Sequence, residues 1–70
     1  MNRAAALDSL PAAYATALRL RDAGLDQEEL ARRLGIAPEA VASTLELADA
    51  KLARLLSVAE ARAEPAGGTP

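Results

Sequence analysis

The longest regular pattern in the sequence is an apolar stripe that begins at Val41. Leucine, valine and alanine side chains then recur at intervals of three or four residues, with one adjacent pair, Leu55 and Leu56: Val41, Leu45, Ala48, Leu52, Leu55, Leu56 and Ala59. This interval places all of them on one face of an α-helix. The stripe spans about five turns, and the sequence predicts a helix that begins at Pro38 and runs past Val58.

Two shorter helices are predicted before it, each marked by its end residues. Pro11 suits the first position of a helix, because its missing N–H has no partner there. Gly24 can adopt a positive φ, and we expect this helix to end there. Asp26 and Glu29 form a D-x-x-E capping pattern for the next helix. Gly35 is again a residue suited to a left-handed helix end.

The three helices define one domain over residues 10–62, as expected for a chain of 70 residues. Residues 1–9 contain the run AAAL, which permits either a flexible end or a short helical turn. Residues 63–70 contain proline, glycine and threonine and no apolar anchor. We expect this tail to be disordered.

The composition favours an all-α fold and excludes several kinds of chemistry. Apolar residues make up 51% of the chain, chiefly alanine and leucine, with a single aromatic residue. The absence of cysteine and histidine removes the usual ligands of zinc and haem and the usual catalytic pairs. We expect no enzymatic activity, no metal and no cofactor. No apolar run reaches the ~20 residues that cross a bilayer, so we expect a cytoplasmic protein with no membrane partner.

The last two helices and the glycine between them have the spacing of a helix-turn-helix. Ala31 is small enough for the helices to cross closely, Gly35 supplies a positive φ, and Ile36 fills the turn. The framework consists of Leu30, Ala31, Leu34, Gly35, Ile36, Val41 and Leu45. An ordinary three-helix bundle is the alternative. We predict a three-to-four-helix helix-turn-helix domain with a long C-terminal helix.

Residues 10–56 resemble region 4 of the bacterial RNA polymerase sigma factors, especially the small extracytoplasmic-function kind. The resemblance is carried by Leu10-Pro11, the run Leu18–Arg21, Gly24-Leu25, Glu29-Leu30-Ala31, Leu34-Gly35-Ile36, Val41, Leu45, Ala48 and Lys51-Leu52. A weaker similarity to the LuxR-type DNA-binding domain follows from the same framework. The sigma resemblance implies a domain that reads the −35 promoter element and contacts the flap of the polymerase β subunit.

The segment that would read DNA departs from this family. Alanine, leucine or an acid occupies positions where the family typically has polar or basic side chains: Ala37, Ala40, Ala42, Glu46, Leu47 and Asp49. Residues 38–50 contain three acids and no base, and the whole chain has a net charge of −2. Most DNA affinity comes from neutralising phosphates, and a carboxylate is repelled by them. Sequence-specific DNA binding is therefore disfavoured.

Four side chains remain as candidate DNA contacts: Arg32, Arg33, Ser43 and Thr44. The first helix of a helix-turn-helix crosses the DNA backbone, so the two arginines could contact phosphates without specifying sequence. Arginines on a small helical domain are more often solvated or paired with nearby acids such as Glu28 and Glu29.

A candidate partner surface consists of four apolar residues: Leu20, Leu47 and Val58, which lie outside the main stripe, and Leu55, which belongs to it. An extra apolar flank on a small domain suggests a binding surface, although single exposed leucines are common. A helix that extends past Leu56 would have a free end able to pair with another chain.

Two functions follow from these patterns. The first is a transcription-related protein that acts by contact with RNA polymerase, a sigma factor, another regulator or a second copy of itself, as a homodimer. The alternative is a sequence-specific DNA-binding transcriptional regulator. The acidic segment 38–50 favours the first.

Overall fold

The computed structural model describes residues 1–63 of the chain. This part contains no strand and consists of helices α1 (Arg3–Ser9), α2 (Ala12–Asp22), α3 (Gln27–Leu34) and α4 (Val41–Ala63), with one 3₁₀ turn, η1 (Pro38–Ala40). The predicted all-α fold with a long C-terminal helix is confirmed. The tail expected at residues 63–70 lies, from residue 64 on, outside the described residues.

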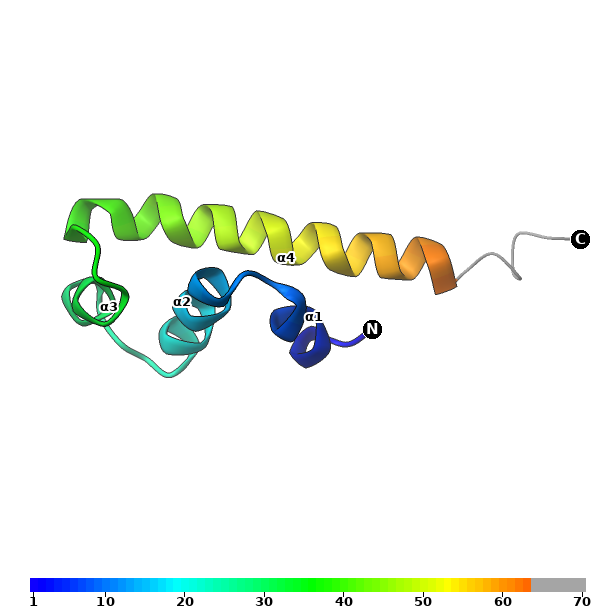
Figure 1. Ribbon diagram of the computed structural model, residues 1–70, viewed down its shortest axis with the longest axis horizontal. Coiled ribbons are helices and arrows are strands. Elements are labelled where there is room, and N and C mark those ends of the chain that lie inside the picture. The colour runs from blue at the N-terminus through cyan, green and yellow to red at the C-terminus, as the bar shows by residue number, and fades with distance from the viewer. Residues whose placement is uncertain (64–70) are drawn as a thin grey trace, which may run out of the picture.

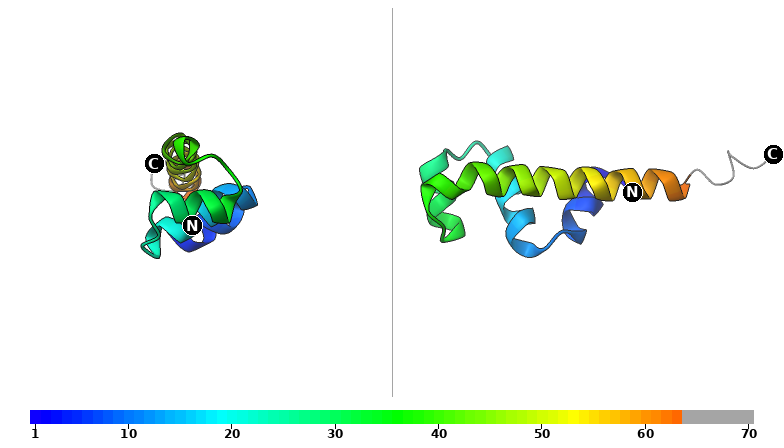
Figure 2. Two further views of the ribbon diagram at one scale, coloured as in Figure 1. Left: turned by 90° about the vertical axis from the view of Figure 1, so that its left-hand side faces the viewer. Right: turned by 90° about the horizontal axis from the view of Figure 1, so that it is seen from above.

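The three short helices pack along the long helix α4. Figure 1 shows it along one side of the molecule, with α3 near its N-terminal end, α2 next to α3 and α1 furthest along. The right-hand view in Figure 2 agrees with this order and shows α4 extending past α1. All three short helices contact α4, so each packs its apolar side against the same helix.

Apolar side chains form two buried clusters along α4. The larger one joins α1, α2 and the middle of α4, through Ala6, Leu7, Leu10, Ala15, Leu18, Ala48 and Leu52. The smaller one consists of Leu30, Ala31 and Val41, where α3 meets the start of α4. Leu45 packs against both clusters and links them. Burying one leucine stabilises a fold by about 1.5–3 kcal/mol, so these few side chains hold the short helices in place.

Residues Arg3–Ser9 form the short helix α1. The side chain of Asn2 accepts a hydrogen bond from the backbone N–H of Ala5 at 2.8 Å and caps the helix. Ala6 and Leu7 are buried against the rest of the domain. Tertiary burial therefore fixes a helix of only 7 residues that would be marginal alone.

The helix that we expected to begin at Pro11 begins one residue later, at Ala12. Pro11 has an extended ψ of 142° and serves as the N-cap instead. Its carbonyl accepts hydrogen bonds from the N–H groups of Tyr14 and Ala15 at 3.0 and 3.1 Å. The reason is the preceding helix: the chain must turn between α1 and α2, and the extended Pro11 makes that turn.

Both predicted glycine helix ends are left-handed, with φ of 92° at Gly24 and 69° at Gly35. Beyond Gly24, the N–H of Leu25 donates to the carbonyl of Leu20 at 3.3 Å. Beyond Gly35, the N–H of Ile36 donates to the carbonyl of Ala31 at 3.0 Å. These are Schellman motifs, in which an apolar residue past the glycine folds back on the helix. Both motifs therefore direct an apolar side chain toward the smaller cluster.

The long helix does not begin directly at Pro38 as predicted. Residues 38–40 form one 3₁₀ turn, and the α-helix follows from Val41. The Gln27 side chain donates a hydrogen bond to the carbonyl of Pro38 at 2.6 Å, which ties this turn to the start of α3. Such 3₁₀ turns are common at the ends of α-helices.

Replacing Ala31 with phenylalanine tests the crossing of α3 and α4. Ala31 is 3% exposed within the smaller cluster, so a larger side chain would overpack it. We expect Ala31→Phe to lower the free energy of unfolding by about 1–3 kcal/mol, measured by urea denaturation with circular dichroism. Ala53→Phe, at an exposed position of α4, is the control and should change little. If Ala31→Phe were as stable as the wild type, Ala31 would not lie where α3 and α4 cross.

Candidate functional site

The predicted helix-turn-helix framework lies where α3, the Gly35 turn and the start of α4 meet. Leu30, Ala31 and Val41 are buried together, and Ile36 and Leu45 pack against them. Leu34 is half-buried on the last turn of α3, and Gly35 makes the left-handed helix end. The Asp26 side chain caps α3 by accepting a hydrogen bond from the Glu29 N–H at 2.9 Å.

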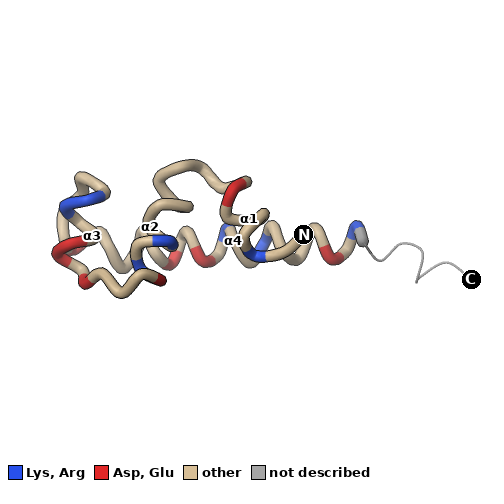
Figure 3. The backbone as a smooth tube through the Cα atoms, turned by 90° about the horizontal axis from the view of Figure 1, so that it is seen from below, with Lys and Arg blue, Asp and Glu red and all other residues tan. Residues whose placement is uncertain are grey.

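The outer face of this framework carries no positive charge after α3. Residues 34–50 contain no lysine or arginine, while Glu39, Glu46 and Asp49 are exposed. Figure 3 shows the acidic positions in the first half of α4 and the first basic position further along the helix. A helix entering the major groove at this end would bring carboxylates toward phosphates.

The hydroxyl groups predicted as DNA contacts bond to their own helix. Ser43 Oγ donates to the carbonyl of Ala40 at 3.1 Å, and Thr44 Oγ1 donates to the same carbonyl at 2.8 Å. A hydroxyl has one hydrogen to donate, so both keep only acceptor capacity for a ligand.

Arg32 and Arg33 share one carboxylate. Arg32 Nη2 lies 2.9 Å from Glu29 Oε1, and Arg33 Nε lies 3.4 Å from Glu29 Oε2. Their side chains are 72% and 60% exposed, and pairs this exposed contribute about 0–1 kcal/mol. The structure therefore pairs both arginines while leaving their guanidinium groups within reach of solvent.

Asp49 is joined to α2, a contact that the sequence pattern did not reveal. Arg21 Nη1 donates to Asp49 Oδ2 at 2.6 Å across 28 positions of sequence. This hydrogen bond is the main cause that raises the pKa of Arg21, aided by the charges of Asp49 and Asp22 and opposed by partial burial. Because the pKa of Arg21 is higher in the folded chain, its protonated form stabilises the fold. This contribution is lost only when the pH rises through the pKa of the folded state. Arg21 therefore remains protonated at any physiological pH.

The four residues of the predicted partner surface have different environments. Leu20 packs against the smaller cluster beside Leu25, and Leu55 is half-buried against the larger one. Leu47 and Val58 are exposed on α4, by 53% and 42%. The structure also places Lys51 and Arg54 beside Val58, along a groove that the prediction did not include.

The buried framework, the left-handed turn and the helix that follows define a helix-turn-helix domain. Residues 4–52 match the family "Sigma-70, region 4", which is more than half of the 70 residues. The chain belongs to this family. It is a family of transcription domains whose members interact with RNA polymerase and with DNA.

Comparisons with curated proteins and with solved structures give no match. Within residues 1–63, no helix combines the length and apolar character needed to cross a membrane.

A double-mutant cycle on Arg21 and Asp49 tests the link between α2 and α4. The side chains are 35% and 49% exposed, so solvent screening keeps their interaction weak. We expect Arg21→Ala and Asp49→Ala to show a coupling free energy of roughly 0.2–1 kcal/mol that falls as salt is added. The cycle of Arg21→Ala with Glu46→Ala is the control and should show none. Zero coupling at low salt for Arg21 and Asp49 would contradict the pair.

Proposed function

We propose that this domain acts in transcription by binding a protein and not by reading a DNA sequence. The partner would be RNA polymerase, a sigma factor, another regulator or a second copy of the chain. The observation that carries this proposal is the charge of the helix-turn-helix. Residues 26–50 contain six acids and two arginines, a net charge of −4.

Recognition of DNA needs both phosphate contacts and donors to base edges. Arginine, lysine, asparagine and glutamine supply most base contacts in the major groove. Residues 34–50 have none of these side chains. A carboxylate there can accept hydrogen bonds only from the amino groups of cytosine and adenine, while it is repelled by the phosphates around it.

The alternative function, a sequence-specific DNA-binding regulator, is favoured by one observation. Arg32 and Arg33 are held only by weak, exposed ion pairs with Glu29 and could exchange that carboxylate for phosphates. Contacts of this kind position a protein on DNA without specifying the sequence. Ser43 and Thr44 would then have to supply the specificity as hydrogen-bond acceptors.

Fluorescence anisotropy with a mixed-sequence DNA duplex separates the two functions. We expect no saturable binding of the wild-type chain at protein concentrations on the order of micromolar, even at low salt. Micromolar binding that weakens steeply with added salt would contradict the proposal, because it would show that phosphates are being neutralised.

Reversing one charge should restore part of the attraction if the acidic helix is its cause. We expect Glu46→Arg to bind the duplex more tightly than the wild type does at low salt, with an affinity that falls as salt is added. Glu60→Arg makes the same change in net charge near the other end of α4 and is the control. An equal gain in both variants would mean that net charge, and not the helix-turn-helix face, limits binding.

A further inference from the structure

Four exposed side chains form a row along α4. Leu47, Lys51, Arg54 and Val58 follow the spacing i, i+4, i+7 and i+11. This is the spacing of the seam through which two helices pack side by side. Leu47 and Val58 are two of the three large apolar residues that remain exposed in residues 1–63. We call these four residues the α4 row.

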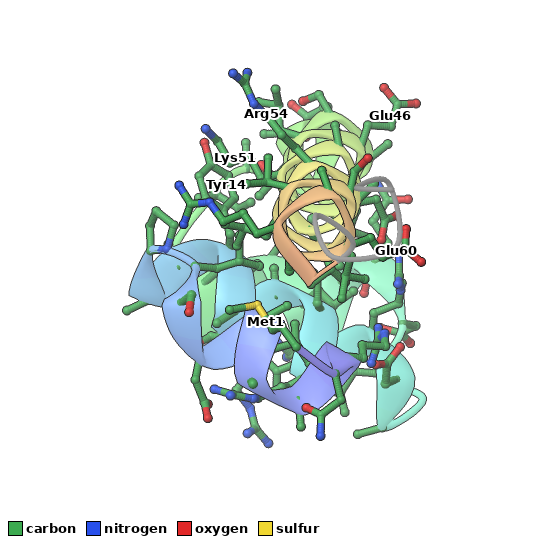
Figure 4. The ribbon with its side chains drawn as sticks, turned by 90° about the vertical axis from the view of Figure 1, so that its right-hand side faces the viewer. Met1, Tyr14, Glu46, Lys51, Arg54 and Glu60 are labelled. Atoms are coloured by element: carbon green, nitrogen blue, oxygen red, sulfur yellow. The ribbon has the colours of Figure 1, made fainter. Side chains whose placement is uncertain are left out.

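A groove runs beside the α4 row where the junction of α1 and α2 approaches α4. It has a volume of about 350 Å³ and is lined by Leu10, Pro11 and Leu55 as well as by members of the row. No acidic residue of the described chain lines it. Figure 4 shows Lys51, Arg54 and Tyr14 on one side of α4, while Glu46 and Glu60 point to the other.

The two cations of the α4 row have no counter-ion within residues 1–63. Each of the arginines before Lys51 forms an ion pair: Arg3, Arg19, Arg21, Arg32 and Arg33. The Lys51 ammonium lies over the Tyr14 ring, 5.5 Å from its centroid, which leaves its charge available. On a chain of net charge −2, the α4 row therefore has two positive charges at its centre that form no ion pair with any residue from 1 to 63.

Arg54, Leu55 and Val58 lie beyond residues 4–52, the part that matches the family. Half of the α4 row therefore lies outside the segment matched to sigma region 4.

We propose that the α4 row and its groove bind one helix of a different protein, with carboxylates in the middle of its contact face and aliphatic residues at either end. The carboxylates would pair with Lys51 and Arg54, and the aliphatic side chains would cover Leu47 and Val58. Opposite charges across a helix pair select the partner. This inference rests on the proposed function in taking the ligand to be a protein.

The charges argue against a second copy of the chain as the occupant. In an antiparallel pair, Leu47 would face Val58, and Lys51 would face Arg54 of the other copy. In a parallel pair, each cation would face its own equivalent. Both arrangements bring four like charges together at the centre, which disfavours association. DNA is disfavoured for another reason, since Leu47 and Val58 would gain nothing against phosphates.

Two synthetic helical peptides test this chemistry with the full chain. Both are fluorescein-labelled and alanine-rich, with leucines at positions i and i+11. One has glutamates at i+4 and i+7, and the other has lysines there. We expect fluorescence anisotropy to give at least about tenfold tighter binding of the glutamate peptide, and the ratio should shrink as salt is added.

Variants with matched controls locate the binding. Arg54→Glu should abolish the preference for the glutamate peptide, while Arg19→Glu, the same change at an exposed position of α2, should retain it. Leu47→Asp should weaken binding about tenfold or more without unfolding the domain, as checked by circular dichroism, because Leu47 is already 53% exposed. Ala53→Asp, on another exposed side of α4, should bind as the wild type does.

Three outcomes would overturn the inference. The first is equal affinity for the two peptides. The second is a preference for the glutamate peptide that remains in Arg54→Glu. The third is a wild-type chain that sediments as a dimer and becomes monomeric in Leu47→Asp. Failure of the proposed function has a different signature, which is salt-sensitive binding of a DNA duplex by the wild-type chain. Duplex binding that Arg54→Glu removes would overturn both, because the α4 row would then be a phosphate contact.

Discussion

Three of the four α-helices in residues 1–63 have 7, 11 and 8 residues, below the ~12 at which an isolated helix becomes even marginal in water. Each of them buries apolar side chains against α4, which has 23 residues. Leu18, Ala17 and Ala48 are completely buried. The short helices therefore depend on one apolar face of α4, and a disruptive substitution in that face would destabilise all three.

The interior of the helix-turn-helix is independent of the charges on its outer side. Packing at Ala31 and Val41 and the left-handed Gly35 set the angle between α3 and α4. None of the exposed acids between Pro38 and Ala50 takes part in that packing. The geometry of a sigma region 4 domain can therefore persist while its outer surface changes charge, which is why family membership alone does not determine the ligand.

Local signals in the sequence predict the helix ends well, because caps and glycine turns act over a few residues. Asp26, Gly24 and Gly35 occupy the expected positions, within the usual error of one or two residues. Contacts that join distant segments could not be predicted in this way. The residues of the Arg21–Asp49 pair are 28 positions apart in the sequence. Leu20 packs against the smaller cluster because of the turn that follows α2, and the spacing of apolar residues does not predict that turn.

The spacing of the α4 row has an evolutionary consequence. In an antiparallel pair of copies, positions 51 and 54 face each other twice, so one charge reversal at either position would turn two repulsive contacts into two attractive ones. The apolar contacts at the two ends of the row, Leu47 against Val58, would already match. A single nucleotide change, from a lysine codon to a glutamate codon at position 51, would therefore remove the charge repulsion that disfavours a pair of copies.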